Sequence, residues 1–190
     1  MRKEEKLLKL EIEAITCKRC RLHETRTNVV FGVGPADAKI MLLGEAPGAN
    51  EDKSGIPFSG AAGKKLDGFL KIAGLGREDV YITNVVLSRP PRNRAPLPDE
   101  VEACRMFLDD HISIIKPKLI VALGRTAAGT LLGRKVVIGE EHGKLLDCTY
   151  TGVKFKLFLT YHPAAALYGA QNKLRLKEDF TKLGKILKLM

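Results

Sequence analysis

The sequence has 190 residues, of which 45% are hydrophobic, and these values suit a single domain over residues 1–190 with an ordinary buried core. No apolar run approaches the about 20 residues that span a bilayer, and residues 2–6 lack the apolar core of a signal peptide, so we expect a cytoplasmic monomer rather than a membrane protein. The formal net charge of +10 favours nucleic acid as the partner, because such a field attracts polyanions; alternatively, the lysines only solvate the surface.

The first predicted element is a helix over residues 1–15. Leu8, Ile12 and Ile15 lie at spacings of four and three, which is typical of one face of an amphipathic helix. We expect these three side chains to form its apolar face. The helix leads directly into a turn that contains Cys17 and Cys20.

Four apolar runs further along the chain predict buried strands, and helical spacing separates them. The strands are expected at residues 38–43, 80–87, 119–123 and 156–161. The helices are expected around residues 66–73, 98–115 and 127–131, with a last helix that turns Leu176, Phe180, Leu183 and Leu187 inward. Apolar strands that alternate with helices favour a parallel sheet covered on both faces. We therefore predict an α/β fold, a three-layer α/β/α sandwich with a central four-stranded parallel sheet.

Chemistry in such a fold gathers at the carboxyl ends of the strands. The loops that follow Leu43, Leu87 and Tyr161 are far apart in the sequence, but this rule predicts that they meet. Candidate functional residues are therefore sought in these three loops.

The segment 44–63 is the densest of these loops. It combines glycine and proline with three carboxylates, Glu45, Glu51 and Asp52, and its end around Ser59 and Gly60 leads into a helix whose backbone N–H groups suit a phosphate. A nucleotide-binding P-loop is excluded, because that motif needs four residues between its glycines and a Ser or Thr after Gly-Lys. For Glu51 and Asp52 the alternative role is loop solvation or a bond to the following backbone.

Two polar residues stand at the ends of other strands. Asn84 is a polar side chain within an apolar run, so it needs a partner or a purpose. Its amide offers a donor beside an acceptor, which matches the O4 and N3–H edge of uracil and mismatches cytosine. His162 follows the last strand directly. Either residue alone is more often structural than functional.

Together these features resemble the thermostable, prokaryotic family 4 of uracil-DNA glycosylases, over about residues 17–180. Gly44-Glu45-Ala46-Pro47-Gly48 resembles the first motif of that family, and the segment His162-Pro163-Ala164-Ala165-Ala166-Leu167 resembles the second. Their order, with the strand asparagine and an Arg-Pro-Pro loop between them, carries the resemblance. It implies a DNA repair enzyme that flips uracil out of the duplex, hydrolyses its bond to the sugar and leaves an abasic site.

The resemblance also implies roles for individual residues. Phe58 would stack on the flipped base, Asn84 would read its edge, and His162 would hydrogen-bond the O2 oxygen where negative charge develops. Glu45 would act on the attacking water and the positively charged sugar. Glu51 would lie beside uracil C5 and exclude the methyl group of thymine. The rest of the substrate-binding loop would be Gly44, Ala46 and Gly48.

DNA contacts follow from the same resemblance. Phosphate contacts would come from Ser59 and Gly60, and from the basic loop through its three arginines, Arg89, Arg92 and Arg94. Leu167 would be the wedge that enters the duplex, with Tyr168 stacking nearby. A sliding clamp is a conceivable further partner, but the sequence has no clear motif for one.

The four cysteines are too few and too unevenly placed for a disulfide scaffold. Family 4 holds a 4Fe-4S cluster with four cysteines, and Cys17, Cys20 and Cys104 match three of these positions. The fourth position is Ser88, a poor ligand unless deprotonated. Three alternatives are therefore open: a cluster with an oxygen ligand, a three-iron form or no cluster. Cys148 lies at no expected spacing, so we expect it to be a bystander.

Two rival functions belong to other classes. One is a uracil-DNA binding or crosslinking protein that uses the same pocket without turnover. Relatives of that kind carry a histidine in the basic loop, and residues 89–98 contain none. The other is a basic DNA-binding protein with a degenerate pocket, which the presence of Glu45, Phe58, Asn84 and His162 disfavours.

Overall fold

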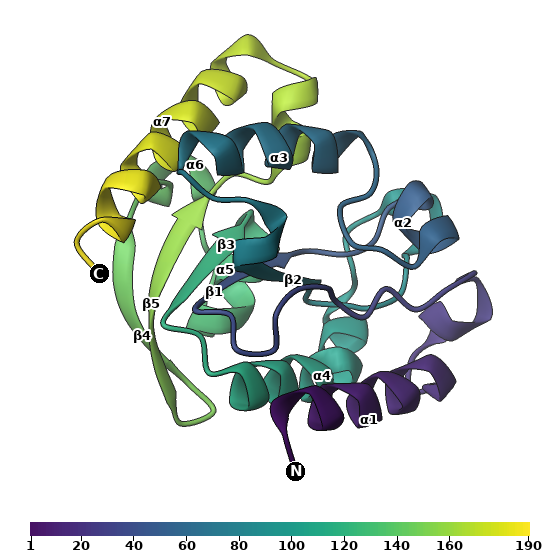
Figure 1. The fold of residues 1–190 in the computed structure, drawn as a ribbon. Helices are drawn as coiled ribbons and strands as arrows, with labels where there is room; N and C mark the ends of the chain where they lie inside the picture. The colour runs from purple at the N-terminus through teal and green to yellow at the C-terminus, as the bar shows by residue number, and fades with distance from the viewer.

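Five strands form one sheet at the centre of the structure, a computed structural model that describes all residues 1–190 (Figure 1). Their order across the sheet is β2-β1-β3-β5-β4. The bounds are Ile40–Gly44 for β1, Val80–Asn84 for β2, Leu119–Leu123 for β3, Leu145–Tyr150 for β4 and Val153–Thr160 for β5. The predicted parallel arrangement is confirmed for β1, β2, β3 and β5.

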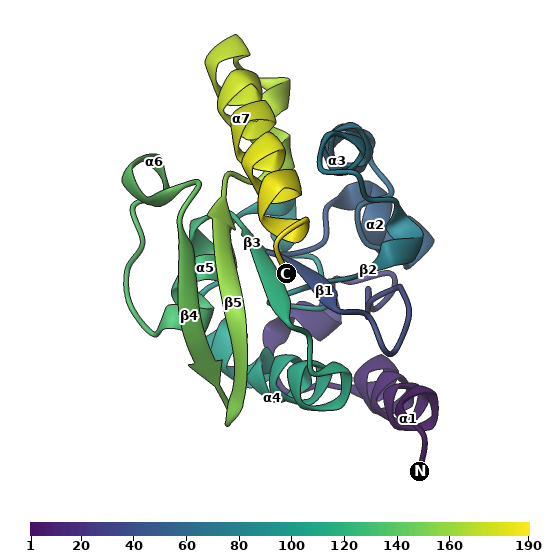
Figure 2. The ribbon, with the colours of Figure 1, turned by 60° about the vertical axis from the view of Figure 1, so that its left-hand side comes forward.

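Helices cover both faces of this sheet, so the predicted α/β/α layering is confirmed (Figure 2). Helices α3 and α7 pack on one face and α4 and α5 on the other, with α1 lying against α4. The bounds are Lys3–Thr16 for α1, Ala49–Ser54 for α2, Ala61–Ile72 for α3, Pro98–Ile115 for α4, Arg125–Leu132 for α5, Ile138–Glu141 for α6 and Ala170–Leu187 for α7. None of them combines the length and the apolar content that crossing a membrane would require.

Strand β1 contributes alternate side chains to the two hydrophobic cores, one on each face of the sheet. Its side chains point to opposite faces in turn, so Met41 and Leu43 belong to the core under α4 and α5, while Ile40 and Leu42 belong to the core under α3 and α7. All four are buried. A strand buried on both faces cannot alternate in polarity, which is why its sequence is a continuous apolar run.

The prediction of four strands is wrong by one edge strand, β4. It pairs antiparallel with β5 through a two-residue turn at Thr151 and Gly152, whose φ angles are both positive, as tight hairpins require. Its polar residues Asp147 and Thr149 are exposed and only Cys148 is fully buried. Because β4 is an edge strand with exposed polar residues, its sequence lacks the apolar run that predicted the other four strands.

The first helix forms as predicted, but its predicted apolar face is wrong. Leu8, Ile12 and Ile15 are 57%, 57% and 58% exposed. The buried face consists of Leu7, Leu10 and Ala14, which pack into the same core as α4. The helix carries apolar residues on two faces, and only contact with α4 decides which one is buried.

One histidine of α4, His111, is buried without charge. Its ring lies between Phe31 and Tyr81, with centroid distances of 4.4 and 5.5 Å. Its Nδ1–H donates to the Phe107 carbonyl at 2.7 Å, and its Nε2 has no partner. Burial lowers the pKa of His111 to about 4.

Protonation of His111 should therefore make stability depend on pH. Between about pH 6.5 and pH 4 the unfolded chain binds this proton and the folded chain does not, so the free energy of unfolding should fall by roughly 3 kcal/mol as the pH falls through this window. Urea unfolding across the window measures this decrease. The variant His111→Phe should lack this part of it, and an equal decrease in both proteins would contradict the assignment.

Candidate active site

The carboxyl ends of the parallel strands border one cleft of about 710 Å³, a size typical of ligand sites. Loops that follow β1, β2 and β5 meet in its wall, as the sequence predicts, and the loop that follows β3 contributes as well. The lining residues from these loops include Glu45, Asn84, Gly124 and His162. Asn93 and Arg94 of the basic loop form a further edge.

Phe58 and Asn84 form the floor of the cleft, and Gly44 lies against both of them. Gly44 and Asn84 are paired at the ends of the neighbouring strands β1 and β2. A Cβ atom on Gly44 would lie 2.3 Å from Asn84 Oδ1 and 2.9 Å from Phe58 Cζ, so only glycine fits there. Asn84 is 3% exposed, and its Oδ1 has no hydrogen-bond partner. A buried acceptor without a donor is costly, which suggests that a ligand supplies the donor.

Phe58 is held in an unusual conformation by residues that the sequence did not reveal. Its φ angle is +53°, which L-residues rarely adopt. Arg77 donates to the Phe58 carbonyl at 2.6 Å and to the Pro57 carbonyl at 3.3 Å, and it pairs with Asp67 at 2.6 Å. Gly63 leaves room for the Phe58 carbonyl, because a Cβ there would lie 1.6 Å from that oxygen.

His162 caps the short 3-10 helix Pro163–Leu167. Its Nδ1 accepts a hydrogen bond from the Ala164 N–H at 3.2 Å, so in the neutral ring the proton is on Nε2. The imidazole stacks on Phe58, with ring centroids 5.5 Å apart and planes at 28°. Burial lowers the pKa of His162, although Glu45 and Glu51 oppose this effect. The ring is therefore neutral at neutral pH and can donate from Nε2.

Glu45 follows β1 directly and is oriented by Thr126 of α5. The Thr126 hydroxyl donates to Glu45 Oε2. This bond leaves Oε1 free to bind another donor, and the carboxylate lines the cleft. Thr126 was not predicted, because it lies 81 residues from its partner and has no motif of its own.

Glu51 and Asp52 have different surroundings. Glu51 lines the cleft, and its Oε1 accepts the Gly60 N–H at 3.0 Å, so this N–H is already used. Asp52 is buried, and its Oδ1 accepts the Thr27 N–H at 2.9 Å. The alternative role of binding the following backbone thus describes Glu51 in part, whereas Asp52 binds backbone that precedes it in the sequence.

The remaining residues of the first motif and the second-motif turn lie around the same opening. Ala46 and Gly48 line the cleft, whereas Ser59 is exposed and its hydroxyl lies 2.8 Å from that of Ser54. Leu167 and Tyr168 are 39% and 86% exposed at the end of the Pro163–Leu167 turn. Such exposed apolar side chains are available to a partner.

The three arginines of the basic loop differ in their freedom. Arg92 is exposed, with a φ angle of +56°. Arg89 donates to Asn93 Oδ1 at 2.7 Å. Arg94 donates both of its Nη groups to the buried Glu100, at 2.8 and 2.6 Å. Arg92 is therefore the arginine of this loop with the fewest internal contacts.

A second, smaller cavity of about 20 Å³ lies among Cys17, Cys20, Cys104 and Ser88. The thiols stand close together, but no three are preformed as metal ligands. Burial raises the pKa of Cys104 to about 12, so these groups would lose protons on binding a metal. Arg26 donates to Ser88 Oγ at 3.2 Å and to the Cys17 carbonyl at 2.9 Å. Cys148 is elsewhere, in β4, with its thiol near the Leu131 carbonyl.

Comparison with known proteins gives one consistent result. The family model of the uracil DNA glycosylase superfamily matches residues 31–187. A type-4 uracil-DNA glycosylase of Archaeoglobus fulgidus is 46% identical, over 92% of this chain and 89% of the relative. Those of Sulfurisphaera tokodaii and Thermotoga maritima are 48% and 45% identical, over 93% and 97% of this chain and 83% and 96% of the relatives.

Two glycines of α3 provide a test of how Phe58 is held. A Cβ at Gly63 would clash with the Phe58 carbonyl, whereas nothing lies within 4 Å of a Cβ at Gly68. Gly63→Ala should lower the free energy of unfolding by about 2 kcal/mol or more. Gly68→Ala, the matched control, should raise it by about 0.5–1 kcal/mol, because alanine is the better helix former. Denaturant unfolding measures both, and equal effects would contradict the geometry.

Proposed function

Because the chain belongs to the uracil DNA glycosylase superfamily and, within it, to the type-4 uracil-DNA glycosylases, we propose that it removes uracil from DNA by hydrolysis. The bond between uracil N1 and deoxyribose C1′ is broken and an abasic site remains. The sequence resemblance that predicted this family is confirmed by the comparisons. Monomeric state, cytoplasmic location and a clamp partner stay predictions.

The observation that carries this proposal is Asn84, a residue of the cleft floor whose buried Oδ1 has no hydrogen-bond partner. The N3–H group of uracil would donate to this oxygen, while the amide N–H₂ of Asn84 would donate to O4. Cytosine has no N–H at position 3, so its N3 would place an acceptor against the acceptor Asn84 Oδ1. Its amino group at position 4 would place a donor against the amide N–H₂. Selection of uracil then follows from one rigidly placed amide.

Uracil can reach this floor only as an extruded base, because a base inside a duplex cannot enter a cleft. Phe58 is the aromatic surface on which the extruded base would stack. Its ring already contacts the position of Gly44 and stacks on His162. Phe58, Asn84 and His162 would thus contact one base from different directions.

His162 would stabilise the departing base. As the N1–C1′ bond breaks, its electron pair stays with uracil, and negative charge develops at O2. The Nε2–H of a neutral imidazole can donate to this oxygen, and its orientation is set in advance by the Ala164 bond. Since the donor stays neutral, it does not attract the backbone phosphates of undamaged DNA.

Glu45 would act on the sugar side of the same bond. Its free Oε1 can accept a hydrogen bond from the attacking water and take the proton that the water loses on adding to C1′. Its negative charge also opposes the positive charge of the oxocarbenium-like sugar. The contact with Thr126 keeps the carboxylate from turning away. Glu51 would lie beside C5, where its position held by Gly60 would exclude the methyl group of thymine.

DNA would lie across the mouth of the cleft. Arg92 and Arg89 are proposed to contact phosphates, together with the exposed Ser59, whereas the Gly60 N–H is already bound by Glu51. Leu167 is proposed to enter the duplex beside the extruded base, with Tyr168 next to it. The exposure of both side chains supports this role.

We also propose that the cysteine cavity is the site of an iron-sulfur cluster. Cys17, Cys20 and Cys104 would hold it through three thiolates, because they line one cavity, while Ser88 takes the fourth position. The donor set therefore fits a cluster with one weak attachment. A cluster bound there would join the loop between α1 and Arg21 to α4, so its role would be structural rather than catalytic.

A non-catalytic or crosslinking uracil-DNA binding protein is the alternative function. It would use the same base pocket without releasing uracil. The basic loop lacks the histidine that this alternative requires, and the Thr126 bond leaves one oxygen of Glu45 free to accept from a water. Turnover therefore distinguishes the two functions.

The excision assay tests both the enzyme and its base reader. A uracil-containing oligonucleotide incubated with the protein and then treated with hot alkali should be cut at the uracil. Asn84→Asp should lower uracil excision by about 10²-fold or more, because a carboxylate lacks the donor that faces O4. The control Asn50→Asp places the same charge at another point of the cleft wall and should retain activity. Binding without cleavage by the unaltered protein would refute the enzyme, and full activity of Asn84→Asp would refute the base reader.

Replacement of Ser88 by cysteine tests the weak attachment. Ser88→Cys should release its iron to a chelator at least about tenfold more slowly than the unaltered protein. Iron per chain and visible sulfur-to-iron absorbance, measured after anaerobic purification, follow this loss. Cys148→Ser, a buried cysteine outside the cavity, serves as the control. A colourless, iron-free anaerobic preparation of all three proteins would refute the cluster.

A further inference from the structure

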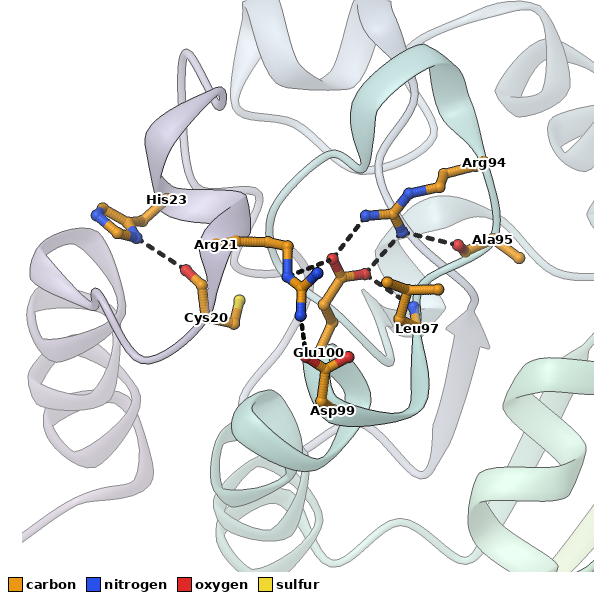
Figure 3. Close-up of polar contacts among 8 residues, drawn as sticks. All are labelled: Cys20, Arg21, His23, Arg94, Ala95, Leu97, Asp99 and Glu100. Carbon is orange, nitrogen blue, oxygen red and sulfur yellow. Dashed lines mark hydrogen bonds and ion pairs between the residues drawn. The ribbon is translucent and has the colours of Figure 1, made fainter.

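Glu100 is a fully buried carboxylate that no part of the proposed reaction uses (Figure 3). Its Oε2 accepts Arg94 Nη1–H and the Leu97 backbone N–H, both at 2.8 Å. Its Oε1 accepts Arg94 Nη2–H at 2.6 Å and lies 3.8 Å from Arg21 Nε. The two carboxylate oxygens of Glu100 thus face four N–H groups, three from arginine side chains and one from the Leu97 backbone.

The bond to Leu97 is an ordinary helix cap, but the others go beyond it. Leu97 precedes the first residue of α4, and a carboxylate three positions later commonly returns to its N–H. A cap needs one oxygen at the surface and no burial. A buried charge is costly unless it is paired, so the bidentate Arg94 must be its main compensation. The same hydrogen bonds lower the pKa of Glu100 and keep it ionised at neutral pH.

Arg94 brings the edge of the cleft into this arrangement. Arg94 and its neighbour Asn93 line the same cleft as the first motif. The backbone before them is strained, because Arg92 and Asn93 both have φ angles of +56°. A loop in this conformation needs contacts that hold it. The structure provides two such contacts, Arg89 to Asn93 and Arg94 to Glu100.

Arg21 extends the arrangement to the cysteine cavity. It follows Cys20 directly, faces Glu100 and pairs with the adjacent Asp99 (Figure 3). Figure 3 shows the loop that carries Cys20 and His23 on one side of Glu100 and the loop that carries Arg94 on the other. One carboxylate therefore stands between the cysteine loop and the edge of the cleft.

We infer that Glu100 is a positioning residue for DNA binding, which holds the Asn93–Arg94 edge of the cleft in place and ties it to the cysteine loop. This inference rests on the proposed glycosylase function. It assigns Arg94 to the fold of the loop, whereas the sequence resemblance assigned it to phosphate. Glu100 would affect the binding of DNA, which precedes the bond-breaking step. Its loss should therefore weaken binding of DNA and leave the bond-breaking step intact.

The test compares Glu100→Gln with Glu102→Gln in the full-length chain. Glutamine keeps the shape of the side chain but has a single acceptor oxygen, so it loses the bidentate contact. Glu102 lies on the same helix, is 68% exposed and pairs only with Arg105, which makes it a matched control. Glu100→Gln should raise KM for a uracil-containing duplex about tenfold while kcat changes by less than about twofold. Glu102→Gln should change neither value by more than about twofold.

Two further measurements separate positioning from folding and from direct DNA contact. Arg94→Gln should raise KM as much as Glu100→Gln, and the double variant should be no worse than either, because the pair acts as a unit. Arg94→Gln also provides the test should Glu100→Gln fail to fold. Unchanged KM in both variants, or a loss of kcat alone, would overturn the inference. Tighter binding by Glu100→Gln would also overturn it, because Arg94 would then be a DNA contact that Glu100 restrains.

Failure of the proposed function would be recognised separately. Fluorescence anisotropy of a uracil-free duplex measures binding without turnover, and the two variants should raise its Kd by a similar factor. If the unaltered protein binds this duplex but never releases uracil from the uracil-containing duplex, the glycosylase proposal fails. The anisotropy values alone then decide the role of Glu100.

Discussion

The close approach of Gly44, Phe58 and Asn84 is the constraint on which the rest of the site depends. Two neighbouring parallel strands end at the same level, so the backbone of one meets the side chain of the other. Because no Cβ fits at Gly44, the amide of Asn84 and the ring of Phe58 share one small region. The backbone conformation of Phe58 and the cap on His162 keep these two side chains beside this region, where their rings stack.

Most residues that orient the site act from outside its motifs. Thr126 turns Glu45, Arg77 holds the backbone of Phe58, and Glu100 holds Arg94. Each uses a hydrogen bond to a charged group, which is stronger and more directional than a neutral one. A site built in this way has little rearrangement left to do when substrate binds, and preorganisation of that kind is what transition-state stabilisation requires.

The sequence predicted the layers, the four parallel strands and the convergence of their loops, because apolar runs and strand-end glycines are local signals. It missed β4, whose exposed polar residues hide an edge strand, and it chose the wrong face of α1, because Leu8 and Leu7 are equally apolar. Asn84 and His162 were found as polar residues at strand ends, whereas the role of Phe58 followed from the resemblance to a family. Arg77, Thr126 and Glu100 could not be found in this way, since their partners are defined only by the folded chain.

The placement of charge in this basic protein has a physical logic. A polyanion is attracted by the overall charge of +10, yet Glu45 and Glu51 line the cleft itself. Under the proposed function, phosphates would be held at the rim by exposed cations such as Arg92, whereas the sugar that becomes positive during bond breaking would lie beside a carboxylate. The two glutamates favour a protonated His162, but burial outweighs them and keeps it neutral. Attraction for DNA would thus come from the rim of the cleft, and stabilisation of the transition state from the groups inside it. Strong binding of undamaged DNA then need not weaken catalysis.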